Sequence, residues 1–151
     1  MTSKLSVPIC SFAEDVAFVL PQPEAAAQWL QGVIQEEGQT LVHLNFVFCS
    51  DNYLHAKNVQ YLQHDTWTDV ITFDYAEAPE QVEGDVYISI DRVRDNAPTY
   101  LHTFCQELYS VMVHGVLHLL GYQDYTPTEK ALMRQQEAKY VAQALQQGLK
   151  M

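Results

Sequence analysis

The chain has few positive charges for its size. Eight lysine and arginine residues stand against nineteen aspartate and glutamate residues in a chain of 151, which gives a formal net charge of −11. This balance argues against broad electrostatic adhesion to nucleic acid or to an anionic membrane. It leaves room for a small basic cleft, or for a metal ion that itself attracts phosphate.

Cysteines are few, and long apolar runs and repeats are absent. Cys10, Cys49 and Cys105 are far apart and form no C-x-x-C pair, which predicts reduced, mostly buried thiols in a reducing compartment. No apolar run is long enough to span a bilayer, and the first residues lack a secretory-type apolar segment. We therefore expect a cytoplasmic protein with no membrane partner, built as one domain over residues 1–151.

The hydrophobic pattern predicts an α+β fold. Strands are expected at residues 9–12, 15–20, 41–49, 69–75 and 85–90, and helices at 24–37, 51–62, 99–120 and 128–147. Because strands come mostly early and helices late, we expect a small mixed sheet packed against a long central helix, residues 99–120. The segment 77–84 is expected to be a connection.

The most informative stretch ends that central helix and runs His114-Gly-Val-Leu-His118-Leu-Leu-Gly121-Tyr-Gln-Asp124. Histidines four residues apart lie on one face of a helix, so one metal ion can take a nitrogen from each. Gly121 can end the helix in a left-handed turn, and that reversal could bring Asp124 back as a third ligand. Three protein ligands with an open position are typical of a catalytic zinc site, since structural sites usually have four.

The spacing matches the first part of the metzincin pattern of zinc peptidases, with one departure. Those enzymes have a glutamate, their general base, directly after the first histidine, and this chain has Gly115 there. A bound ion would still acidify a water, but the group that deprotonates this water must come from elsewhere. The pattern therefore favours a metal hydrolase that does not use the peptidase mechanism.

Simpler interpretations of these residues stay open. A histidine pair on an apolar helix can be two ordinary core residues, although Gly121 and Asp124 stand at the offsets that a ligand triad needs. Asp124 can also be a turn residue ahead of the next helix. That helix has its own start signal, a capping box of Thr126 and Glu129, so Asp124 is free for another role.

The same stretch resembles the signature H-G-x-L-H-L-x-G-Y-D-H of the YbeY family of bacterial rRNA-processing endoribonucleases. Residues 65–73 (DTWTDVITF) are similar to the family's D-x-x-T-[DN]-V-L-S-F segment, and residues 84–89 (GDVYIS) to its G-D-I-x-I-S strand. Asn58 and Tyr61 fit the helix before these segments, so the resemblance covers most of the chain from Asn58 onward. It implies an α+β fold with a mixed sheet of about four strands flanked by helices.

The resemblance also implies a metal site, from which this chain departs. Three histidines of the motif hold the family's metal; two match His114 and His118, and the third falls on Asp124. Aspartate can bind zinc through oxygen, but its charge would make the ion a weaker electrophile. Leu62 stands where the family commonly has an arginine facing the cleft, which removes a bidentate phosphate contact. The basic residues nearest in sequence that could replace it are Lys57, Arg92 and Arg94.

As a function, the resemblance implies a zinc-dependent endoribonuclease specific for single-stranded RNA, with one zinc ion per chain. It implies a role in rRNA maturation and ribosome quality control, with an rRNA precursor and the ribosome or ribosomal proteins as partners. The ion would bind the scissile phosphate and either acidify a water or polarise the phosphoryl group for attack by the 2′-hydroxyl. His64 and Asp65, in a polar loop within a motif segment, are the candidate catalytic residues.

Two other functions are compatible with the residues. The ligand spacing favours a metal-dependent hydrolase of peptides or small esters, whereas Gly115 counts against it. Leu62 and Asp124 favour a non-catalytic ribosome-associated module that keeps a metal for stability. The first function predicts cleavage of casein rather than RNA, and the second predicts intact RNA in the presence of the metal-bound protein.

Overall fold

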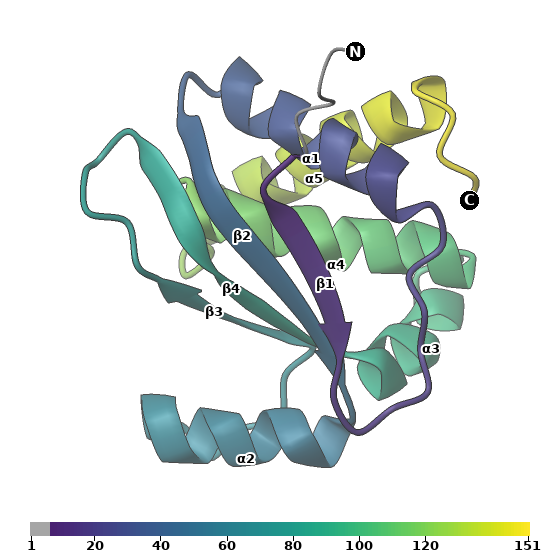
Figure 1. The fold of residues 1–151 in the computed structure, drawn as a ribbon. Helices are drawn as coiled ribbons and strands as arrows, with labels where there is room; N and C mark the ends of the chain where they lie inside the picture. The colour runs from purple at the N-terminus through teal and green to yellow at the C-terminus, as the bar shows by residue number, and fades with distance from the viewer. Residues whose placement is uncertain (1–6) are drawn as a thin grey trace, which may run out of the picture.

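Residues 7–151, the part of the chain that the computed structural model describes, form an α+β fold (Figure 1). The strands are β1 (Ile9–Ala13), β2 (Thr40–Cys49), β3 (Val70–Asp74) and β4 (Gln81–Ser89), and the helices are α1 (Pro23–Glu36), α2 (Asp51–Leu62), α3 (Ile90–Thr99), α4 (Phe104–Leu119) and α5 (Pro127–Gln146). The four strands form one sheet in the order β1-β2-β4-β3, in which β3 is antiparallel and the others are parallel. The prediction of a small mixed sheet flanked by helices is confirmed.

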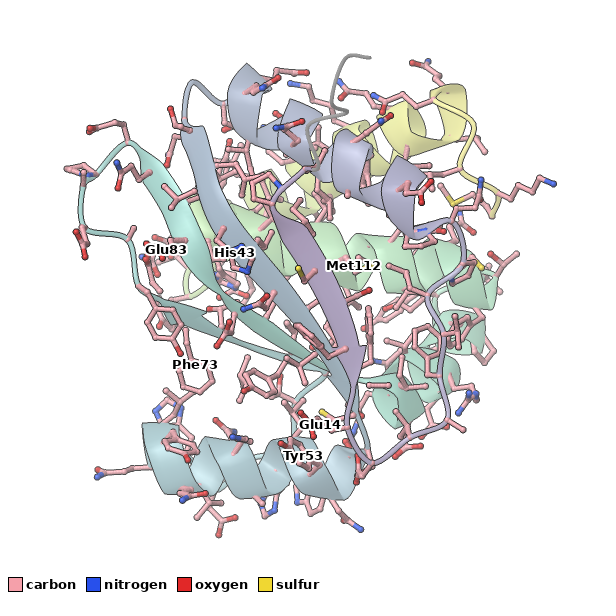
Figure 2. The ribbon with its side chains drawn as sticks, viewed as in Figure 1. Glu14, His43, Tyr53, Phe73, Glu83 and Met112 are labelled. Carbon is pink, nitrogen blue, oxygen red and sulfur yellow. The ribbon has the colours of Figure 1, made fainter. Side chains whose placement is uncertain are left out.

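The helices cover the two faces of the sheet unequally (Figure 1). Leu44, Phe46 and Phe48 of β2 are buried on the face covered by α1 and α4, in the large core to which α5 also contributes. Helix α2 lies on the other face over a smaller apolar cluster. Figure 2 shows Met112 of α4 on the first side and Tyr53 of α2 on the second.

Gly115 allows α4 to approach the sheet closely. A Cβ atom at this position would lie 2.6 Å from Val86 Cγ1 of β4 and 3.6 Å from Thr72 Cγ2 of β3. The residue after the first histidine of the motif therefore faces the sheet. A glutamate there, as in the zinc peptidases, would collide with Val86.

The prediction of one long helix over residues 99–120 is wrong at its N-terminal end, because the helix begins only at Phe104. Helix α3 continues to Thr99, Leu101 adopts a left-handed φ of 59°, and α4 begins after Thr103. Thr103 and Gln106 form a capping box, which marks the true start of α4. The apolar periodicity runs across the break and therefore hides this start signal.

Two strand predictions also need correction. Pairing of β1 with β2 ends where the Glu14 N–H donates to the Phe48 carbonyl, and residues 15–20 form no strand. Their apolar side chains enter the core without strand pairing, as Phe18 does by packing edge-on against Phe48 at 4.9 Å. Strand β4 begins at Gln81, so the second half of the predicted connection 77–84 belongs to the sheet.

The three cysteines are free but differ in exposure. Cys49 is buried, Cys105 is partly buried and Cys10 is exposed, so the prediction of mostly buried thiols is wrong for Cys10. Burial raises the pKa of the Cys49 thiol to about 12, which makes it a poor nucleophile. None of the helices within residues 7–151 has both the length and the apolar character to cross a bilayer.

The close approach of α4 to the sheet predicts opposite effects for two glycine-to-alanine substitutions. Gly115→Ala is expected to lower the free energy of unfolding, because overpacking against Val86 costs about 1–3 kcal/mol. The higher helix propensity of alanine offsets at most about 1 kcal/mol of that cost. Gly32→Ala in α1 is the matched control, since nothing lies within 4 Å of a Cβ there. It is expected to stabilise by about 0.5–1 kcal/mol. Urea unfolding in the presence of a chelator measures both, and equal stabilisation would contradict the close approach.

Candidate metal centre

The last turns of α4 and the loop after it bring His114, His118 and Asp124 together. The Nε2 atoms of the two histidines lie 3.0 Å apart. Asp124 Oδ2 lies 3.5 Å from His114 Nε2 and 3.4 Å from His118 Nε2. All three side chains are partly buried. The three residues that the sequence predicts as ligands therefore form one cluster.

The dimensions of this cluster fit a metal ion. Zinc binds histidine nitrogen and carboxylate oxygen at about 2.0–2.1 Å, so two ligands of a tetrahedral ion lie about 3.3 Å apart. The three separations in the cluster, 3.0, 3.4 and 3.5 Å, bracket that value. The group can therefore hold a metal ion by three protein ligands, with a fourth position left for water or substrate.

The end of α4 explains how Asp124 reaches the histidines. Gly121 has a φ of 107°, a left-handed conformation that favours glycine. Its N–H donates to the His118 carbonyl, and the Tyr122 N–H donates to the Leu117 carbonyl, which is the Schellman arrangement. The predicted left-handed helix end is confirmed, and the chain reverses there.

Hydrogen bonds at Nδ1 orient both imidazole rings. His114 Nδ1 lies 2.5 Å from Glu137 Oε2 of α5, and His118 Nδ1 lies 3.0 Å from the Tyr122 carbonyl oxygen. A ring that donates from Nδ1 keeps the lone pair of Nε2 for a metal, and metal-binding histidines almost always have such a partner. Glu137 was not predicted, because no local spacing relates it to the histidine motif.

Helices α1 and α5 hold the loop that follows α4. The Tyr122 hydroxyl donates to Glu37 Oε1 at 2.7 Å and accepts from Gln136 Nε2 at 3.0 Å. The Tyr140 hydroxyl donates to the same Glu37 carboxylate. Since the Tyr122 carbonyl orients His118, these contacts fix both the ring and the loop around it.

His114 and Asp124 of the cluster line a cavity of about 930 Å³ along α4 and α5. Its lining includes the acidic residues Asp69, Glu107, Asp124 and Glu137 and the basic residues Lys130 and Arg134. Burial raises the pKa of the Asp69 carboxyl and also that of Glu107. The cavity therefore combines a candidate metal centre with carboxyl groups that are suited to accept protons.

The acidic surroundings also affect His114. Burial lowers the pKa of its imidazole, but the hydrogen bond that His114 Nδ1 donates to Glu137 and the charges of Glu137, Asp69 and Asp124 outweigh burial, so the net pKa is raised. A raised pKa means that protons compete with a metal for this ring up to a higher pH than they do for an ordinary histidine.

Comparison with known proteins identifies the family. A family model described as Endoribonuclease YbeY matches residues 15–145. The chain belongs to the YbeY family. Family membership supports an endoribonuclease role, and it confirms the resemblance that the motifs indicate.

Individual relatives agree with the YbeY assignment. The Endoribonuclease YbeY of Amoebophilus asiaticus is 59% identical over 130 residues, which cover 86% of this chain and 88% of the relative. That of Cytophaga hutchinsonii is 45% identical over 126 residues, 83% of this chain and 88% of the relative. A solution structure of a protein from Thermotoga maritima has a TM-score of 0.61 at 29% identity and covers 90% of this chain and 88% of its own, which supports the fold.

The structure places the two predicted catalytic residues of this YbeY chain outside the cavity. His64 and Asp65 are exposed in the loop between α2 and β3. His55 Nε2 lies 2.8 Å from Asp65 Oδ1, and the His55 ring stacks on Trp67 at 3.9 Å. Asp69, at the other end of the same loop, lines the cavity. A catalytic role for His64 or Asp65 stays a prediction.

The contact between Glu137 and His114 predicts a loss of metal affinity on substitution. Glu137→Gln is expected to weaken zinc binding by about 10–100-fold, because the ring loses the carboxylate that fixes its orientation and basicity. Competition with a chromogenic chelator at fixed pH measures the affinity. Glu36→Gln is the matched control, since Glu36 pairs with Lys139 at 2.7 Å and does not line the cavity. Equal affinities of the two variants would argue against the role of Glu137.

Proposed function

We propose that this protein is a zinc-dependent endoribonuclease that cleaves single-stranded RNA in rRNA maturation and ribosome quality control. The observation that carries the zinc dependence is the triangle of two Nε2 atoms and one carboxylate oxygen, with edges of 3.0–3.5 Å. Two of its residues, His114 and Asp124, line a cavity in a chain of the YbeY family. We further propose that residues 1–151 act as one hydrolase domain.

In the proposed reaction, the zinc ion and the protein side chains have different roles. Zinc on His114, His118 and Asp124 would supply a Lewis acid for the phosphoryl oxygen and lower the pKa of a bound water. Glu137 keeps His114 in the tautomer that leaves Nε2 free. We assign Asp69 as the proton acceptor for the attacking water or 2′-hydroxyl, because it lines the cavity and burial raises the pKa of its carboxyl above the usual value.

The proposed partners are an rRNA precursor and the ribosome or ribosomal proteins, in the cytoplasm. A net charge of −11 supplies little non-specific attraction to RNA. The choice of cleavage site would therefore depend on contacts that the ribosome or a partner protein provides, in addition to those of the cavity.

A side-by-side assay with RNA and casein tests the proposed activity. The substrates are an end-labelled RNA hairpin with single-stranded flanks, and casein. Zinc-loaded protein is expected to cut the flanks and leave casein intact, and EDTA or His114→Ala is expected to abolish cleavage. Cut casein with intact RNA would favour the peptide hydrolase, and no cleavage of either substrate by metal-loaded protein would favour the non-catalytic module.

The same RNA cleavage assay tests which carboxyl group acts as the general base. Asp69→Asn is expected to lower kcat by about 10²–10⁴-fold while zinc content stays at the wild-type level, because the carboxyl accepts a proton and does not bind the metal. Asp65→Asn tests the exposed loop candidate under identical conditions. A loss of kcat in Asp65→Asn, with Asp69→Asn fully active, would contradict the assignment of Asp69 and identify Asp65 as the general base.

A further inference from the structure

A phosphodiester at the candidate metal centre would meet a strongly acidic wall. Asp69, Glu107, Asp124 and Glu137 all line the same cavity. Like charges repel more strongly in a partly buried site than in water, so the phosphate needs positive charge from the protein beyond that of the ion. The family's cleft arginine would supply such a charge, and Leu62 stands in its place.

The basic residues nearest to Leu62 in sequence are engaged elsewhere. Lys57 Nζ lies over three tyrosine rings, the nearest at 4.8 Å. Arg92 Nε lies 3.0 Å from Asp51 Oδ1, and the Arg94 guanidinium lies 5.6 Å from the Phe104 ring centroid. None of the three lines the cavity. The replacement suggested by sequence proximity is therefore not the one that the fold provides.

Two other basic residues do line the cavity, together with His114. Lys130 and Arg134 are four residues apart on α5 and so project from one face of that helix, one turn apart. Both are exposed, and neither takes part in an ion pair among residues 7–151. Their charges are therefore available to a ligand.

The face of α5 that lines the cavity changes from charged to apolar along the helix. After Lys130 and Arg134 comes Glu137, the partner of His114, and beyond it the cavity wall is apolar, with Val141 and Leu145. On the α5 side of the cavity, charged residues thus lie at one end and apolar residues at the other. This polarity matches a nucleotide chain whose phosphates lie near the metal and whose bases or riboses lie against the apolar wall.

We propose that Lys130 and Arg134 bind the RNA backbone at the phosphates that flank the scissile one, in place of the family's cleft arginine. The inference rests on the proposed endoribonuclease function and specifies how the same site holds its substrate. The planar guanidinium of Arg134 can bind two phosphate oxygens at once, whereas Lys130 supplies a point charge.

Binding of a fluorescein-labelled uridine oligonucleotide to the zinc-loaded protein, followed by anisotropy over a range of salt concentrations, tests this inference. Probe integrity is checked on a gel after each titration. Lys130→Gln and Arg134→Gln are each expected to weaken binding and to reduce the salt dependence, d log K/d log[salt], by about one. Arg134→Lys is expected to keep the salt dependence and to lose affinity, because it keeps the charge but not the bidentate contact.

Lys139→Gln is the matched control, because it removes one positive charge from the same helix outside the cavity. It is expected to bind like the wild type. If Lys130→Gln and Arg134→Gln behave as Lys139→Gln does, the inference is overturned, whether or not RNA is cleaved. If the wild type binds RNA through these residues but never cleaves it, the inference holds and the proposed activity fails.

Discussion

The packing of α4 against the sheet at Gly115 is the constraint on which the rest of the site depends. Residue 115 points from the helix about 100° away from residue 114, while residues 114 and 118 share one face. With Gly115 seated against Val86, His114 projects to the side of the helix that meets Glu137 of α5, and His118, about 60° from Gly115, projects toward the Tyr122 carbonyl of the reversing loop. The absence of a side chain at this position sets the direction of the ligands and removes the base of the zinc peptidases at the same time.

Two other parts of the chain, α5 and the C-terminal end of α1, complete the site that α4 begins. Helix α5 supplies Glu137 to His114, and α1 supplies Glu37 to the loop that carries Asp124. The same α5 face brings Lys130 and Arg134 to the cavity. The site is thus acidic around its ligands and basic at one rim, an arrangement suited to hold a cation first and an anionic substrate beside it.

The sequence predicts the features of the site that depend on residues close together in the chain, but not the residues that tertiary packing brings to the site. The i, i+4 histidines, the left-handed turn and the capping box that starts α5 depend on neighbours a few residues away, and each is found as expected. Glu137 reaches the site only through packing of α5, so no local spacing identifies it. Asp69 stands at the [DN] position of a motif segment, but only the packing of the loop before β3 places it in the cavity. The sequence also does not reveal the break between α3 and α4 at Leu101, because the apolar periodicity continues past it and the capping box of Thr103 and Gln106 lies within that periodic stretch.

Metal content of the purified, untagged protein shows whether His114, His118 and Asp124 form one metal site. Inductively coupled plasma mass spectrometry would compare the wild type with His114→Ala and Asp124→Ala. We expect about one equivalent of zinc in the wild type and its loss in both variants, because a site with only three protein ligands does not hold the ion when one of them is removed. Full zinc content in Asp124→Ala, or no metal in the wild type after zinc is offered back, would contradict it.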